Sequence, residues 1–183
     1  MGDREFPLDQ LWIDERLVVA LSAIEGSGLF FTEDLPVGTV VVRLGGRVVS
    51  SVELDDLIRR AETTPGADYV DTITLDDDAH LVLPSGTAVH FGNHSCDPTL
   101  WFVAPAELVT RQAVTASQEA TIDYGTVSGA DGFTMECRCG STACRGQVTS
   151  DDWKQPELQA RYRGHWVPAL RKRIDGVRDR DEG

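Results

Sequence analysis

The sequence predicts an α+β protein that is mainly β, with small helices. Two patterns point to this class. Short runs of β-branched and other apolar residues alternate with Gly and Pro along most of the chain, whereas helical spacing appears only around residues 50–63 and after residue 150. The 183 residues suffice for one domain with an extensive core.

The strands are predicted where β-branched runs lie between turn residues. The first three cover residues 17–21, 39–42 and 47–49, and glycines and prolines separate them. Further short strands are expected at residues 69–75, 81–83, 89–91, 100–103, 108–111 and 120–124.

One helix is predicted between the strands. Ser50 and Glu53 have the spacing of a capping box, in which each residue satisfies a backbone N–H of the other. Apolar residues then recur at helical spacing as far as Thr63. The sequence therefore predicts a helix that begins at Ser50 and ends near Thr63.

The C-terminal segment is also expected to be helical. Pro156 suits a first helical turn, and Asp151 or Asp152 before it can act as a cap. Apolar side chains then follow four residues apart, at Leu158, Tyr162 and Trp166. A second short helix is expected over 168–174, and the small, charged residues 175–183 are expected to form a mobile tail.

The charge of the chain restricts its partners. Seventeen Lys and Arg face thirty Asp and Glu, a net charge of −13. Such a surface repels phosphate, so direct nucleic-acid binding is not expected, whereas a basic polypeptide or amine would be attracted. The alternative is that the acidic excess only maintains solubility.

The sequence also bears on compartment. Its apolar runs reach about five residues against the roughly 20 that span a bilayer, so no membrane segment is expected. The first residues lack the layout of a secretory signal. A cytoplasmic location is therefore expected, with the nucleus left open, and the thiols should stay reduced.

Four cysteines match one tetrahedral metal site. Three of them form a Cys-x-Cys-x4-Cys segment and the fourth comes from a distant loop: Cys96, Cys137, Cys139 and Cys144. Structural zinc is commonly held by four thiolates at about 2.3 Å. Free buried thiols or a disulfide are the alternatives, but a reducing compartment and Cys-x-Cys geometry disfavour the disulfide. Arg138 and Arg145 would offset the thiolate charge.

Three sequence blocks occur in a fixed order around these cysteines. They are Gly26-Ser27-Gly28-Leu29-Phe30, Asn93-His94-Ser95-Cys96-Asp97-Pro98 and Glu119-Ala120-Thr121-Ile122-Asp123-Tyr124-Gly125. With Cys-Arg-Cys-Gly after them, this order resembles the SET-domain protein lysine methyltransferases that carry a post-SET zinc segment. The resemblance covers about residues 17–149.

The resemblance implies a fold of short curled β-sheets with a pseudoknot, in which the Asn93 segment crosses the Asp123-Tyr124 segment. It also implies a post-SET zinc loop and C-terminal helices. The corresponding division is an N-terminal segment 1–16, a SET domain 17–125, a post-SET zinc segment 126–149, a helical extension 150–174 and the tail 175–183.

The activity implied by the resemblance is methyl transfer from S-adenosylmethionine to the side-chain amine of a lysine in a basic protein. Tyr124 would be the catalytic residue. The cofactor would be bound by Gly26, Ser27, Gly28, Tyr69, Asn93 and His94. One structural zinc ion would be held by Cys96, Cys137, Cys139 and Cys144, ordering the post-SET loop over the cofactor.

The chemistry explains these residue types. Displacement at a sulfonium methyl needs a neutral amine about 3 Å away, so positioning is the main contribution of the protein. A desolvated channel lowers the pKa of a lysine ammonium. Glycines let the backbone approach the cofactor closely.

The sequence departs from the family pattern at several positions. His90 stands where Arg is often found, and Ile122 replaces an aromatic residue that in relatives helps to set the number of methyl groups added. The aliphatic Ile122 leaves room, so transfer of more than one methyl group is expected.

Two other functions compete with this interpretation. One is a methyltransferase that acts on a non-protein amine or a peptide. The other is a non-catalytic module that binds zinc and cofactor, although the joint presence of Asn93, His94 and Tyr124 speaks against it. The oligomeric state, the substrate and the target lysine are left open.

Overall fold

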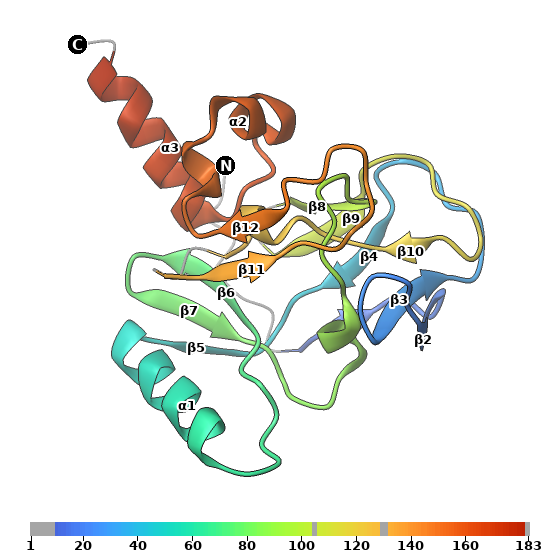
Figure 1. Cartoon of the computed structure of the whole chain (residues 1–183), viewed down its shortest axis with the longest axis horizontal. Helices are drawn as coiled ribbons and strands as arrows, with labels where there is room; N and C mark the ends of the chain where they lie inside the picture. Colours follow the sequence, from blue (N-terminus) through green and yellow to red (C-terminus); the bar gives the residue numbers. More distant parts are fainter. Residues whose placement is uncertain (1–9, 104–105, 129–131, 182–183) are drawn as a thin grey trace.

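The computed structural model describes residues 10–103, 106–128 and 132–181. Within these ranges the chain forms four small antiparallel sheets and three α-helices, with three short 3-10 turns (Figure 1). The predicted fold class, mainly β with small helices, is confirmed. No helix in these ranges has the length and apolar character that a membrane span requires.

Two of the sheets contain the glycine-rich segment 26–30 and strands that precede and follow the Asn93 segment in the sequence. Their strand orders are β1-β4-β9-β8 and β10-β3-β2. The bounds are β1 Trp12–Ile13, β2 Leu17–Leu21, β3 Ser27–Phe31, β4 Val40–Arg43, β8 Leu100–Val103, β9 Glu107–Thr110 and β10 Glu119–Ala120. In Figure 1 the sheet of β2, β3 and β10 lies at the right, farthest from helix α1 (Ser51–Thr63).

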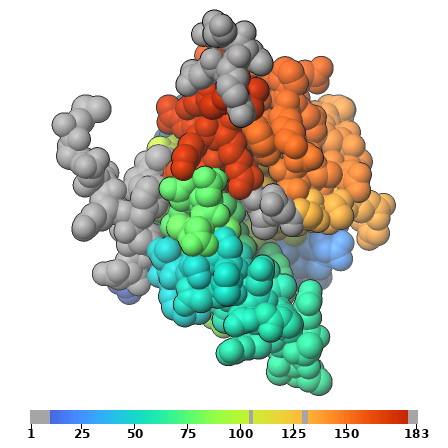
Figure 2. Space-filling model, turned by 90° about the vertical axis from the view of Figure 1, so that its left-hand side faces the viewer, coloured from blue at the N-terminus to red at the C-terminus, as the bar shows by residue number. Residues whose placement is uncertain are grey.

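The third sheet, with the order β5-β7-β6, lies between two helices. Its strands are β5 Arg47–Val49, β6 Thr72–Asp76 and β7 Ala79–Val82. Figure 2 shows the β6–β7 hairpin between α1 and the C-terminal helix α3 (Pro168–Asp181). Lys172 Nζ on α3 lies 2.9 Å from an Asp76 carboxylate oxygen, which ties this helix to the hairpin. A fourth sheet pairs β11 (Thr134–Glu136) with β12 (Gln147–Thr149).

Helix α1 begins with the predicted capping box. The backbone N–H of Glu53 donates to Ser50 Oγ at 3.3 Å, and the backbone N–H of Ser50 donates to the Glu53 carboxylate at 2.9 Å. The Ser50 hydroxyl also donates to this carboxylate at 2.9 Å, and the two hydrogen bonds that the carboxylate accepts from Ser50 lower the pKa of Glu53. The helix ends at Thr63, as predicted.

Three predicted strands differ in the structure. Residues 89–91 belong to a 3-10 helix, η1 (Ala88–Phe91), and not to a strand. Strand β6 begins at Thr72 instead of residue 69, and β10 ends at Ala120, before the 3-10 turn η2 (Tyr124–Thr126). An apolar run by itself does not distinguish a strand from a tight turn, and here the chain turns to bring Asn93 and Tyr124 together.

The position of the first C-terminal helix was predicted, but its N-terminal cap was not. Helix α2 (Pro156–Tyr162) has Pro156 in its first turn, as expected. Its N-cap is Gln155, without a side-chain cap, whereas Asp152 belongs to the 3-10 turn η3 (Asp152–Lys154) and is buried. The expectation that Asp151 or Asp152 caps the helix was therefore wrong, because the Asp152 carboxylate forms an ion pair with Arg145 instead.

Helix α3 is longer than predicted. It continues through Asp181, so the predicted end near Ile174 was wrong, and residues 175–181 are helical rather than a tail. Residues 182–183 of the predicted tail lie outside the described residues. The extension has partners, since Val177 is half-buried and Arg178 Nη2 donates to Gln159 Oε1 of α2 at 3.4 Å.

The hydrophobic core joins the sheets to the C-terminal helices. Tyr162 and Trp166 are 1% and 2% exposed, and their rings meet edge to face at 5.7 Å between centroids. Tyr162 and Trp166 are therefore core residues. A second small core surrounds Cys96, Cys137 and Val148.

Candidate functional site

The two segments expected to cross at the site lie side by side. His94 and Ile122 form an isolated parallel β-bridge. The backbone N–H of Ile122 donates to Asn93 O at 3.1 Å, and the N–H of Ser95 donates to Ile122 O at 3.1 Å. These backbone hydrogen bonds place Asn93 and His94 next to the residues that lead into Tyr124.

Tyr124 is held by its backbone and by its phenol. Its backbone N–H donates to His94 Nδ1 at 3.1 Å, and its hydroxyl donates to the carbonyl of Gly92 at 2.8 Å. Burial, together with the negative charge of Asp71, raises the pKa of Tyr124 to about 12. The phenol is therefore neutral at physiological pH, and its oxygen keeps lone pairs to accept a further hydrogen bond.

His94 links Tyr124 to the cysteines through its side chain. Because Nδ1 accepts from Tyr124, the ring proton is assigned to Nε2, which lies 3.4 Å from Cys96 Sγ. Burial lowers the pKa of His94, so the ring is neutral. The sequence analysis assigned His94 to the cofactor and did not predict these contacts of its side chain.

Asn93 and the glycine-rich segment are brought together as predicted. The Asn93 side-chain amide donates to Ser27 O at 3.1 Å, to Glu25 O at 3.3 Å and to Glu119 Oε1 at 2.7 Å. Asn93 therefore orders the loop beside which a cofactor would lie. The Asn93 carboxamide oxygen has no hydrogen-bond partner among the described residues, so it is available to accept a hydrogen bond.

Two glycines of that loop have different reasons to be glycine. At Gly28, a Cβ would stand 2.1 Å from Glu119 Oε1, so only glycine leaves room for this carboxylate. Gly26 has φ +43°, and no atom lies within 4 Å of the position its Cβ would take. The backbone is thus packed against Glu119 at Gly28, whereas it has free space beside it at Gly26.

Glu119 and Ser22 were not predicted as site residues. Ser22 Oγ donates to Glu119 Oε1 at 2.8 Å, across 97 residues of sequence. Glu119 also receives the Asn93 amide, so it joins β10 to the glycine-rich loop. Its place at the start of the block Glu119-Ala120-Thr121-Ile122-Asp123-Tyr124-Gly125 was the signal for it in the sequence.

An apolar cavity of about 480 Å³ opens beside Tyr124. Its wall includes the Ile122 side chain and three aromatic residues, Tyr69, Tyr124 and Phe133. Tyr69 was predicted together with the cofactor residues, and the structure brings it to the wall that Tyr124 also lines. It lies outside any strand and is 67% exposed.

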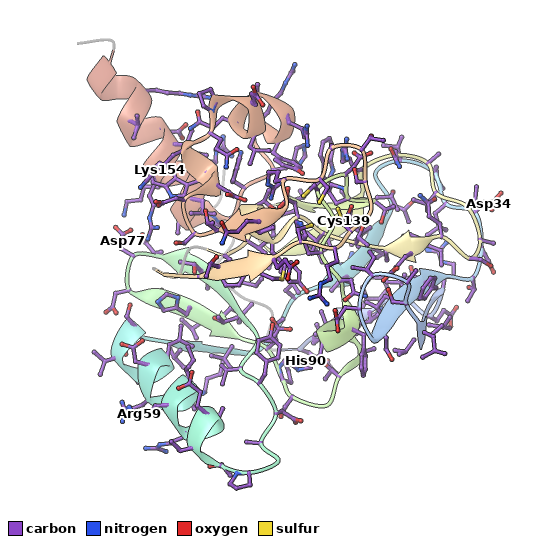
Figure 3. The ribbon with its side chains drawn as sticks, in the orientation of Figure 1. Asp34, Arg59, Asp77, His90, Cys139 and Lys154 are labelled. Carbon is purple, nitrogen blue, oxygen red and sulfur yellow. The ribbon has the colours of Figure 1, made fainter. Side chains whose placement is uncertain are left out.

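The four cysteines converge as the zinc prediction requires. Their sulfur atoms all lie within 4.8 Å of one another, and Cys96 Sγ and Cys137 Sγ are 3.7 Å apart. A tetrahedron with metal–sulfur distances of about 2.3 Å has sulfur–sulfur edges of about 3.8 Å. Figure 3 shows the yellow sulfur atoms near Cys139, where the loop between β11 and β12 passes over the site.

Backbone N–H groups point at these sulfur atoms. Arg145 N donates to Cys96 Sγ at 3.3 Å, Cys96 N to Cys139 Sγ at 3.5 Å and Gly146 N to Cys144 Sγ at 3.4 Å. Such donors favour thiolates. Against the effect of burial, the backbone N–H groups of Cys96 and Ser141 and the thiols of Cys137 and Cys144 lower the pKa of Cys139 to about 7. Burial raises the pKa of Cys96 and of Cys137. A divalent cation would offset this charge, and the donor set fits zinc. The four cysteines form no disulfide.

A buried ionic network lies behind Tyr124. Arg145 makes a two-pronged ion pair with Asp123, both distances 2.7 Å, and contacts Asp152 at 2.9 Å. The Tyr162 hydroxyl donates to Asp123 at 2.7 Å. Arg145 was expected to offset thiolate charge. The charge of Arg145 opposes part of the rise that burial causes in the pKa of Cys96, but its direct partners are these carboxylates. Arg138 pairs with exposed Glu136 instead.

Comparison with known proteins agrees with the geometry. Residues 26–125 match the family model described as SET domain. The chain is 31% identical over 142 residues to "Histone-lysine N-methyltransferase, H3 lysine-4 specific" of Mycosarcoma maydis, which covers 72% of this chain and 10% of that protein.

Two further relatives carry similar names. The chain is 27% identical over 152 residues to "Histone-lysine N-methyltransferase SUV39H2" of Gallus gallus, covering 67% of this chain and 37% of that one. It is 29% identical over 140 residues to "Histone-lysine N-methyltransferase 2B" of Homo sapiens, covering 72% and 5%. The chain thus spans only a minor part of each of these relatives.

Proposed function

The chain belongs to the SET domain family, and on this premise we propose that it is a protein-lysine methyltransferase that uses S-adenosylmethionine. The observation that carries the proposal is the place of Tyr124. Its phenol lies on the wall of an apolar cavity, beside the junction of the Asn93-His94 and Ile122 segments. The names of the relatives support a lysine side chain as the acceptor.

The residues present fit the proposed cofactor. The open backbone at Gly26, with Ser27 and Gly28, would face it, and the Asn93 carboxamide oxygen would accept from its amino group. The backbone of His94 would adjoin its adenine, as the resemblance implies. When bound, S-adenosylmethionine supplies an electrophilic methyl group.

Tyr124 would orient the acceptor amine. Because its hydroxyl proton is donated to Gly92 O, its oxygen is left to accept an N–H from the amine. That hydrogen bond directs the nitrogen lone pair toward the methyl group. Positioning of this kind is the main contribution of the protein to methyl transfer. The apolar wall lowers the pKa of the entering ammonium and favours the neutral amine.

The four cysteines would hold one structural zinc ion. Cys96 follows Asn93 and His94 directly, so metal binding at Cys96 would order the cofactor segment and the β11–β12 loop together. The division into a SET domain at 17–125, a zinc segment at 126–149 and a helical extension from 150 belongs to this proposal, with the extension continued through Asp181.

The proposed substrate is a basic protein segment of the histone type. A net charge of −13 attracts such a segment, and the relatives are named for histone lysines. A cytoplasmic site of action, or a nuclear one, is compatible with that substrate class. Neither a membrane nor a nucleic acid is proposed as a partner.

Radiolabelled S-adenosylmethionine tests the proposal. The purified protein, with its metal content measured, is incubated with histones, with mixed basic proteins and with lysate, and Tyr124→Phe serves as the inactive control. We expect label on lysine in a basic protein with the wild type only. Label confined to small molecules would favour an amine or peptide methyltransferase instead. Cofactor binding by calorimetry without any transfer would favour a non-catalytic module.

The number of methyl groups is a separate part of the proposal. Ile122 lines the cavity with an aliphatic side chain, which leaves room for a methylated nitrogen and offers it no phenol. We expect mass spectrometry to find di- or trimethylated product after long incubation. Monomethylated product alone, with substrate and cofactor in excess, would contradict this expectation.

A further inference from the structure

One carboxylate lies on the aromatic wall of the cavity, and apart from its effect on the pKa of Tyr124 it has no role in the chemistry described above. The described cavity lining contains three acidic residues, of which Glu62 and Asp68 are exposed. Asp71 differs, because its side chain is only 21% exposed. Its backbone is also fixed, since Leu83 N donates to Asp71 O at 3.0 Å.

Two neighbours hold the Asp71 carboxylate in place. His90 Nδ1, on the 3-10 helix η1, lies 3.2 Å from Asp71 Oδ2, and the Tyr69 hydroxyl donates to Asp71 Oδ1 at 3.4 Å. Figure 3 shows His90 beside the chain that runs from α1 to β6. His90 Nε2 lies 2.8 Å from Pro84 O, which can only accept, so Nδ1 can donate to Asp71 only in a ring that carries both protons. Within the described residues no arginine or lysine contacts this carboxylate.

The surroundings of Asp71 match an organic cation. Tyr69, Tyr124 and Phe133 line the same cavity and offer aromatic faces, which attract ammonium and methylated ammonium groups. A carboxylate adds a charge-assisted hydrogen bond wherever the cation keeps an N–H. The apolar remainder of the wall suits the methylene chain that carries such a group.

We propose that Asp71 binds the side-chain ammonium of the substrate inside the cavity and thereby selects for amines that retain an N–H. The inference rests on the proposed function of the site and names a residue that sets its specificity. Asp71 stabilises positive charge on the nitrogen, which is present in the bound ammonium and develops again in the transition state of methyl transfer, so its loss weakens both states about equally. Its effect is therefore expected in KM more than in kcat.

The test uses small probes, because the substrate protein is not identified. The probes are butylammonium, N,N-dimethylbutylammonium, N,N,N-trimethylbutylammonium and the neutral 1-butanol, titrated against the full chain with its metal and followed by NMR at about 0.15 M salt. We expect wild type to bind butylammonium and the dimethyl probe about tenfold or more tightly than 1-butanol, and the trimethyl probe more weakly than the dimethyl probe.

Asp71→Asn should remove that preference. The substitution keeps the shape of the side chain and removes its charge, so the affinity for butylammonium should approach that for 1-butanol. Asp55→Asn is the matched control, because it removes one exposed carboxylate from α1 outside the cavity and should leave all four affinities unchanged. If Asp71→Asn keeps the wild-type preference, or Asp55→Asn loses it equally, the inference is wrong.

Two measurements keep the test decisive. If Asp71→Asn does not fold, the wild-type series decides: equal binding of butylammonium and 1-butanol, or tighter binding of the trimethyl probe than of the dimethyl probe, refutes the inference. With an active substrate, Asp71→Asn should raise KM about tenfold while kcat changes much less. Since probe binding needs no methyl transfer, failure of this inference and failure of the proposed function are separate results.

Discussion

The two sides of the segment Ile122-Asp123-Tyr124 have opposite character. Ile122 and Tyr124 line the apolar cavity, whereas Asp123, 1% exposed, points into the ionic network of Arg145 and Tyr162. Alternation along an extended backbone allows one short segment to serve both regions. The cavity contains space for a ligand, while the network is filled by its own partners, so substitutions in the network should affect stability and those in the cavity should affect activity.

The largest expected effect is on stability and lies in the network. Arg145→Met leaves Asp123 and Asp152 buried without their cation, and breaking a buried pair in this way typically costs about 3–5 kcal/mol. Urea unfolding measures the change. Arg138→Met is the control, since this exposed arginine forms surface pairs and its loss should alter stability little. Equal stability of the two variants would contradict the contrast between the regions.

The next effect is on activity and lies in the cavity. Tyr124→Phe removes the hydroxyl that orients the amine, and loss of one preorganised polar group lowers the rate by roughly 10² to 10³. Methyl-transfer rates at saturating substrate measure it. The Tm should change much less than in Arg145→Met, because only one half-buried hydrogen bond is lost. A variant that is fully active would remove Tyr124 from the mechanism.

The cysteine cluster should couple metal binding to cofactor binding. Cys96→Ser is expected to lose zinc and, in parallel, to bind S-adenosylmethionine more weakly, because Cys96 continues directly from the Asn93-His94 segment. Metal analysis and calorimetry check the two quantities on the same sample. Wild-type cofactor affinity in metal-free protein would show that the cluster and the cofactor segment are independent.

The smallest expected effect is a pH dependence of stability that arises at His80, which belongs to neither region. His80 on β7 is 6% exposed, its Nε2 lies 3.0 Å from Ser51 Oγ, and burial lowers its pKa below 6.5. The unfolded chain then binds a proton that the folded chain does not, so stability present above pH 6.5 is lost as the pH falls below it, by at most about 1.4 kcal/mol per pH unit. His80→Gln should flatten this slope in urea unfolding measured between pH 5 and 7. An unchanged slope would mean that other groups cause it.

Part of this protein was predictable because the relevant interactions are local. The Ser50–Glu53 capping box, the strands at 17–21, 47–49 and 100–103, and the three-cysteine segment depend on residues a few positions apart, which periodicity and spacing reveal. The same reasoning placed helix α2 but ended α3 too early. The extended part of α3 contacts Gln159 on another helix, and a charged composition alone does not reveal such a contact.

The amino-acid sequence by itself determined the class of fold, the four cysteines and the blocks that carry the family resemblance. Only the tertiary structure decided the partners of the site: Arg145 with Asp123 across 22 residues, Tyr162 with Asp123 across 39, and Ser22 with Glu119 across 97. It likewise placed Asp71 on the wall shared with Tyr124. Such pairs are formed by burial and by the need to satisfy buried polar groups, and these requirements exist only once distant segments have packed together.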